Sequence, residues 1–333
     1  MDFGEVNTTT LVSIVVSLIS VTALYSIIFK VFQNPSFETL RTANLTMAVF
    51  HMIFAIIMIV SDRFSEDKWM VFYEEDVIEQ GNVAGDTVKD KTSAIRKRIY
   101  EKKKKRNEIG TIFKLCGVFS LITSLFHIFP LIFPSIYESN ISQSNNPARW
   151  VEYFVTSGIM MTSIASVSDI KSEYALLSVF AFTAITNIFG MAIEATTHPL
   201  YKWAFMIFGF IPFVIPWYMI SKNYSQYKST YKDFEELLDE YEEVPLGDTV
   251  ITKKTLEEGK GSIDKLRILI IVIFALYNTF PAIQINQILS PEKYRLGELN
   301  FIIASFISKV VLNLMVFGLG NRPDFTAYST RDV

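Results

Sequence analysis

Long apolar stretches recur along this chain, and they restrict it to folds that cross a membrane. Eight of them are long enough to span the hydrocarbon core of a bilayer, which takes about 20 residues of α-helix. Half of the 333 residues are hydrophobic, and 28 are Phe. We therefore predict an all-α, multi-pass membrane protein. The expected spans are residues 10–33, 42–61, 110–136, 149–168, 174–195, 202–221, 266–288 and 297–320.

The first span is expected to be a retained helix rather than a signal peptide. A signal peptide begins with a cationic segment, whereas the leading MDFGEVNTTT is acidic. The apolar run of residues 10–33 is also about twice as long as the core of a signal peptide.

Two connections, residues 62–109 and 222–265, are dense in charge, and we expect loops with at most a helical stretch in each. The run RKRIYEKKKKRNEIG just before the third span is typical of a solvated surface, but such a run can also contact anionic membrane lipid.

Composition argues against several classes of protein. A net charge of −3 gives no support to nucleic-acid binding. The single cysteine, Cys116, excludes an internal disulfide and cannot form a metal site by itself, so we interpret it as a small buried hydrophobic residue. The sequence contains no catalytic triad, metal cluster or phosphate-binding loop, and we do not expect an enzyme.

Lys309 lies near the middle of the last span, FIIASFISKVVLNLMVFGLG. A charged lysine at the centre of a membrane helix costs roughly 2.5 to 3.5 kcal/mol on insertion scales. The nearest charges along the chain, Glu298 and Arg322, are 11 and 13 residues away, so the side chain is badly placed to reach a headgroup. A buried lysine can be a neutral amine, a salt-bridge partner, a proton carrier or a Schiff base with an aldehyde.

Few other ionisable residues lie deep in the spans. His51 and His127 are near the centres of the second and third spans, and Glu152 is shallower. Glu152 follows Arg149 by three residues, which places both on nearly the same helical face. Residues of this kind usually face the interior of a bundle and indicate a functional site. Taken alone, each histidine also fits a core residue that hydrogen-bonds between helices.

The lysine and the glutamate are expected to approach each other. Their spans begin on the same side of the membrane, and the lysine stem points back toward the N-terminus of its helix, where Glu152 lies. Residue counting still leaves a difference in depth of roughly 10 Å. Ser305, four residues before Lys309, can bond a group on the lysine nitrogen or its own helix backbone.

Several local strings resemble the heliorhodopsin family of microbial-type rhodopsins, and they occur in the order of the spans. RWVEY, the terminal SK and the two helix-centred histidines form the most specific combination. The resemblance covers about residues 38 to 322. The strings are LRTANLTMAVFHMIFAIIMIVSD, SLFHIF, RWVEYFVTSGIMM, FGMAIE, FGFIPFVIPW, NTFPAIQ and ELNFIIASFISK.

The resemblance implies a fold and a membrane placement. Residues 38–333 are expected to form a seven-helix rhodopsin-like bundle, and residues 1–37 a tail with one extra transmembrane helix. Family members are usually dimers with a slow photocycle, are mostly not pumps, and have the C-terminus outside. The positive-inside rule favours the opposite orientation, because the long loops hold most Lys and Arg residues. We adopt the orientation of the family, because long charged loops are poor indicators of membrane orientation.

The resemblance also assigns roles to residues. Lys309 is expected to carry all-trans retinal covalently as a protonated Schiff base, with Glu152 as its counterion and Ser305 beside it. Without the matching strings, the aromatic and Met residues of the expected pocket would be interpreted as ordinary packing. The other matching residues are His51 and His127 in a proton-accepting cluster, and Met160, Trp217, Phe280 and Tyr153 in the retinal pocket.

The chain departs from the family pattern at several positions. Ser308 stands where alanine commonly precedes the lysine, and Asn313 and Leu314 replace the usual Ala-Trp after it. The extra first span and the two long charged loops are also atypical. These differences concern colour, cycle speed and partners more than retinal binding.

Three functions are compatible with the sequence. The first is a light sensor with a slow photocycle and no active pumping, because the helix of Glu152 has no second carboxylate before Asp169. The alternative is a light-driven proton translocator or channel in which Glu194 and Arg149 form part of a path. The third uses no light: a transporter with an intramembrane Lys/Glu pair, or a regulator whose loops bind an unidentified signalling partner.

Overall fold

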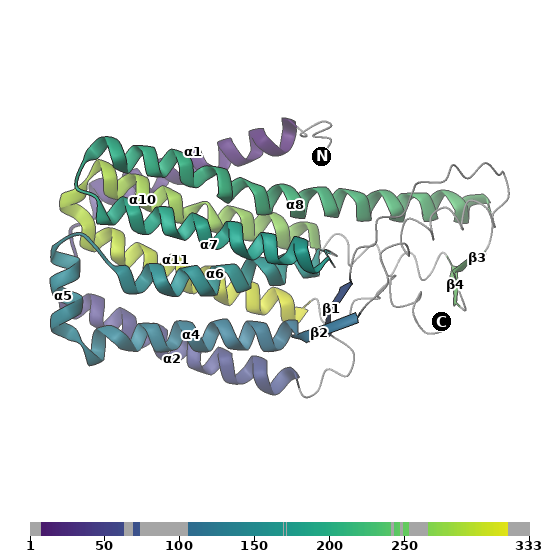
Figure 1. Ribbon diagram of the computed structural model, residues 1–333, viewed down its shortest axis with the longest axis horizontal. Coiled ribbons are helices and arrows are strands. Elements are labelled where there is room, and N and C mark those ends of the chain that lie inside the picture. Colours follow the sequence, from purple (N-terminus) through teal and green to yellow (C-terminus); the bar gives the residue numbers. More distant parts are fainter. Residues whose placement is uncertain are drawn as a thin grey trace.

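The computed structural model is an elongated helical bundle (Figure 1). It describes residues 8–62, 69–73, 106–168, 170, 172–240, 243–246, 249–252 and 266–318. The long helices within these ranges are α1 (Thr8–Val31), α2 (Phe37–Asp62), α4 (Ile112–Ile132), α6 (Pro147–Val167), α7 (Glu173–Ala195), α8 (Pro199–Glu240), α10 (Thr279–Leu289) and α11 (Tyr294–Gly318).

The eight predicted spans all fall on helical segments. Six described helical segments are long and apolar enough to cross a membrane. The helix α6 is not among them because Arg149, Glu152 and several Ser and Thr residues lower its mean hydropathy. In α1, the segment Ile19–Val31 is apolar but shorter than a full span.

Seven of the helices close into a ring by packing against their neighbours. In order around the ring these are α2, α4, α6, α7, α8, α10 and α11, and α11 returns to α2. The remaining helix, α1, packs on the outside against α10. Large apolar side chains such as Leu45, Ile56 and Ile207 are exposed on the bundle surface, whereas buried positions hold many polar groups. This distribution suits a bundle surrounded by lipid, and the fold is a ring of seven helices with one extra N-terminal helix.

Local sequence explains where several helices begin and break. Asn146 caps α6, its side chain accepting from the Arg149 N–H, and Pro147 occupies the first helical position. Ser172 caps α7 in the same way. The seventh span, Leu266–Leu289, is interrupted at Asn278, because Pro281 has no N–H to continue the ladder.

One end of the bundle is filled by the short helix α5 (Pro134–Ser142), which precedes α6, and by the 3₁₀ turn η1 (Pro291–Lys293) before α11 (Figure 1). At the other end α8 runs on past its neighbours to Glu240, for 42 residues in all. The connection predicted from residue 222 therefore starts as a continuous helix.

The connections contain two short pairs of antiparallel strands that were not predicted from the sequence. Strand β1 (Trp69–Tyr73) pairs with β2 (Arg106–Thr111), and β3 (Glu243–Leu246) pairs with β4 (Thr249–Thr252). Most of the polybasic run and most of the 62–109 connection lie outside the described residues, as do the two chain ends.

Candidate functional site

Lys309 on α11 is buried and forms an ion pair with Glu152 on α6. The Lys309 Nζ donates to Glu152 Oε1 and, at 2.9 Å, to Ser305 Oγ. Lys309 and Glu152 reach the same depth, although residue counting had predicted a difference. The reason is that α6 starts only after α5 has filled the end of the bundle, while α11 starts further out (Figure 1). The three residues that the sequence placed at the reactive centre therefore lie together.

Further donors complete the surroundings of Glu152. Thr123 Oγ1 on α4 lies 2.8 Å from Oε1, and Thr156 Oγ1, one turn after Glu152, lies 3.0 Å from it. A buried ion pair is favourable only when extra hydrogen bonds replace lost water, and these hydroxyls supply them. The sequence analysis missed Thr123, although its four-residue spacing from His127 places both on one face of α4.

The two membrane histidines stack on each other. The ring centroids of His51 on α2 and His127 on α4 are 5.8 Å apart, with planes inclined by 2°. His127 Nδ1 lies 2.7 Å from Asn44 Oδ1. Since an amide oxygen only accepts, this nitrogen donates, and Nε2 remains an acceptor. Within the described residues, His127 Nε2 and both ring nitrogens of His51 have no hydrogen-bond partner.

A small cavity lies between this region and a second charged cluster. It has a volume of about 30 Å³, enough for one or two water molecules. His127 and Glu152 line one part of it, and Arg149 and Glu298 line another. The two groups therefore border one shared cavity.

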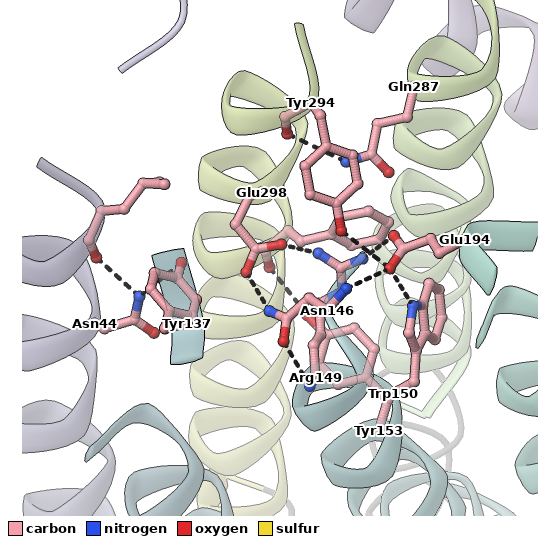
Figure 2. A network of polar contacts seen from close by, with 12 residues as sticks. Asn44, Tyr137, Asn146, Arg149, Trp150, Tyr153, Glu194, Gln287, Tyr294 and Glu298 are labelled. Atoms are coloured by element: carbon pink, nitrogen blue, oxygen red, sulfur yellow. Dashed lines mark hydrogen bonds and ion pairs between the residues drawn. The ribbon is translucent and has the colours of Figure 1, made fainter. Parts of the chain in front are cut away.

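The second cluster centres on Arg149, which lies between Glu194 of α7 and Glu298 of α11 (Figure 2). Its guanidinium forms ion pairs with both carboxylates and lies 4.1 Å from the ring centroid of Phe301. All three charged groups are buried. One cation facing two carboxylates leaves an excess of negative charge that neutral donors must stabilise.

Those donors surround the two carboxylates (Figure 2). Glu194 Oε2 accepts from Trp150 Nε1 at 2.8 Å, from Tyr294 OH at 3.0 Å and from the Asn146 N–H at 3.0 Å. The Asn146 amide also donates to Glu298 Oε1 at 2.7 Å. Trp150 reaches Glu194 by lying across Gly190, where a Cβ atom would be 2.2 Å from the indole ring.

Glu298 and Tyr294 were not predicted as site residues. Glu298 was treated only as a charge near the end of the last span. Its distances of 7 and 11 residues from Ser305 and Lys309 are helical repeats, so all three lie on one face of α11. That spacing was the sequence signal that could have identified Glu298.

Tyr137 on α5 lies near Glu298. Burial raises the pKa of its hydroxyl, and the negative charge of Glu298 is the next cause, so Tyr137 remains neutral.

A largely apolar cavity of about 110 Å³ extends from Lys309 between α6, α7, α8 and the seventh span. The four predicted pocket residues Met160, Trp217, Phe280 and Tyr153 all line it. Trp217 packs edge-on against Tyr277, with ring centroids 5.6 Å apart, and Tyr153 against Phe280 at 5.5 Å. A largely apolar cavity with aromatic lining residues and a buried amine suits a polyene aldehyde such as retinal.

The remaining groups of interest among the described residues are potential metal ligands and the single cysteine. In the part of the chain that is described, no three His, Cys, Asp or Glu side chains are grouped to hold a metal ion. Cys116 is free and buried, as expected for a small hydrophobic residue.

Comparisons with known proteins agree with this arrangement. The heliorhodopsin family model matches residues 40–234. Among solved structures, xanthorhodopsin, a light-driven ion pump with a dual chromophore, aligns with a TM-score of 0.51 and 11% identity, over 86% of this chain and 96% of its own. A thermophilic rhodopsin aligns with a TM-score of 0.49 and 11% identity, over 90% and 98%. No curated protein sequence matches.

At 11% identity the likeness to xanthorhodopsin concerns the fold alone. The family model, in contrast, covers more than half of the chain and includes the helices of His51, His127 and Glu152. This chain therefore belongs to the heliorhodopsin family and is a retinal-binding, multi-pass membrane photoreceptor.

Proposed function

We propose that this photoreceptor is a light sensor in which Lys309 carries all-trans retinal and Glu152 is the counterion. The observation that carries the proposal is the buried Lys309–Glu152 ion pair at the end of an aromatic cavity. Lys309 would hold all-trans retinal through its amine, and the bound chromophore would supply an aldehyde carbon for that link and a polyene that changes shape on absorbing light.

The residues of the chain divide the remaining work. Glu152 stabilises a positive nitrogen on Lys309, and Ser305 orients that nitrogen at 2.9 Å. The aromatic residues Trp217, Phe280 and Tyr153 hold the polyene and exclude water. His127 is a suitable proton acceptor, because its Nε2 is unpaired and it shares the small cavity with Glu152.

We further propose a slow photocycle without active pumping. After Glu152, the helix α6 continues to Val167 without a second Asp or Glu, so no deep carboxylate can return a proton along it. Under illumination, cells that make the pigment are expected to show no sustained photocurrent when held at zero voltage without a pH gradient. A lasting outward or inward current under those conditions would contradict a sensor without transport.

A specific observation favours the alternative, a proton translocator or channel. The small cavity places Glu152 and His127 next to Arg149, and Arg149 binds Glu194 near the bundle end. If this path conducts, photocurrents should follow an imposed pH gradient and fall at least about tenfold in Glu194→Gln. Glu138→Gln is the matched control, because Glu138 lies near the same end but is only half-buried and pairs loosely with Arg41 at 3.8 Å.

The family pattern leads us to propose that the C-terminus and the 62–109 connection lie outside the cell. An epitope inserted in residues 74–105 should then bind antibody on intact cells. An epitope at residues 34–36, at the opposite end of α2, should bind only after permeabilisation. The reverse result would establish the orientation favoured by the positive-inside rule.

We also propose a homodimer that can present its charged connections to a signalling partner. The basis is family membership together with the exposed apolar faces of the bundle. The mass of the purified pigment in mild detergent tests this assembly, since a dimer should have twice the mass of the chain.

A further inference from the structure

The C-terminal end of α1 is held by a lysine from the turn before α11. Lys293 Nζ donates to the Phe29 carbonyl and lies 3.4 Å from the Lys30 carbonyl and 3.1 Å from the Phe32 carbonyl. The last carbonyls of a helix have no partners within it and favour a positive charge. Lys293 therefore closes the end of α1 with a group from 261 to 264 residues further along the chain.

The linker after α1 makes the reciprocal contact. Asn34 Oδ1 accepts from the N–H of Leu296, in the first turn of α11, at 3.1 Å, and Asn34 Nδ2 donates to the Glu292 carbonyl at 2.6 Å. The first N–H groups of a helix need such acceptors. Lys293 thus caps α1 while Asn34 caps α11.

Two further contacts fix α1 along the bundle. Ser26 Oγ donates to Asn286 Oδ1 on α10 at 2.8 Å, and the Asn286 amide lies 3.4 Å from the Thr22 carbonyl. Phe29 is 2% exposed and belongs to a core cluster that also contains Trp150 and Phe301. The extra helix therefore lies outside the ring but is packed firmly against it, and is more than an appended membrane anchor.

The turn that α1 holds is also the turn that completes the Arg149 cluster. Tyr294 begins α11 and donates to Glu194, and Glu298, one turn later, binds Arg149. We propose that α1 acts as a strap that positions the first turn of α11, with Lys293 and Asn34 as positioning residues for Tyr294 and Glu298. This role goes beyond the proposed light sensing and can be tested without retinal.

The test is amide hydrogen exchange on the full-length, retinal-free protein in detergent. Lys293→Met keeps the aliphatic stem but removes the charge, and Asn34→Ala removes both bonds of the linker at a half-buried position. In each variant, exchange at residues 298–302 should become about 10-fold faster, as expected for the loss of one or two polar contacts. Lys293→Arg keeps the positive charge, so exchange at these residues should be as slow as in the parent protein.

Asn223→Ala is the matched control. Asn223 on α8 also donates an amide hydrogen bond to a carbonyl of another segment, that of Ser168 at 2.5 Å, but at the opposite end of the bundle. It should leave exchange at residues 298–302 unchanged. If Lys293→Met and Asn34→Ala accelerate exchange only within residues 20–36, or if Asn223→Ala has the same effect at 298–302, α1 does not position α11.

Discussion

Replacing Lys309 by alanine is expected to abolish the visible absorption of protein supplied with all-trans retinal. The buried Nζ is the amine at the end of the aromatic cavity, and Lys309 is the one lysine among the described residues that line it. Without it the aldehyde has no partner for a covalent bond, and any bound retinal should keep the near-ultraviolet spectrum of the free compound. Absorption spectra of the purified variant and of the parent protein, at equal concentration, measure the effect.

Loss of colour must be separated from loss of folding. Lys309→Ala leaves the Glu152 carboxylate buried without its cation, which typically costs about 3 to 5 kcal/mol of stability. The double variant Lys309→Ala with Glu152→Gln removes both charges and should fold better while remaining colourless. Lys309→Arg keeps a cation beside Glu152 and should also be colourless, because a guanidinium does not condense with an aldehyde under these conditions. A visible band that persists in any of these folded variants would refute the assignment.

The spans and the pairing of Lys309 with Glu152 were predictable because both depend on strong constraints. A run of about 20 apolar residues has few alternatives to a membrane helix. A lysine at mid-membrane needs a partner, and Glu152 on a parallel helix is among the few candidates. The pocket residues Trp217 and Phe280 depended instead on the family resemblance, since an aromatic side chain in a bundle is usually ordinary packing.

The Arg149 cluster was only partly predictable, for a physical reason. Whether Glu298 turns inward depends on where α11 begins and on which helices meet there. Those features involve α5, η1 and the contacts of Lys293 with the end of α1, which join segments about 260 residues apart. Local spacing showed that Glu298 shares a face with Lys309, but not that Arg149 lies opposite it.

The length of α8 and the two strand pairs were not predicted from the sequence, for a related reason. The residues after 221 are charged, so composition favoured a loop, yet a helix that has already started continues at little cost. Lys232 and Glu236 add an ion pair one turn apart at 3.4 Å, a spacing that supports an exposed helix. Strands β1 and β2 pair across more than 30 intervening residues, which no local pattern specifies.

The pigment is expected to lose its visible colour as the pH is raised. In Glu152→Gln this loss should occur at a much lower pH than in the parent protein. The amide can still accept from Thr123 and Thr156, so the local packing is retained, but the negative charge beside the Lys309 nitrogen is gone. Removing one partner of a buried ion pair costs about 3 to 5 kcal/mol, and one pH unit corresponds to 1.36 kcal/mol. The midpoint of colour loss should therefore fall by roughly 2 to 4 pH units.

An absorbance titration of the purified pigments measures that midpoint. Glu152→Asp keeps the charge and should shift it far less than Glu152→Gln. Glu298→Gln is the sharper control, because this carboxylate is also buried and belongs to the same helix as Lys309, yet it pairs with Arg149. If Glu298→Gln lowers the midpoint as much as Glu152→Gln does, the positive nitrogen responds to the summed charge of both clusters. If only Glu152→Gln does so, the stabilisation is local and Glu152 alone is the counterion.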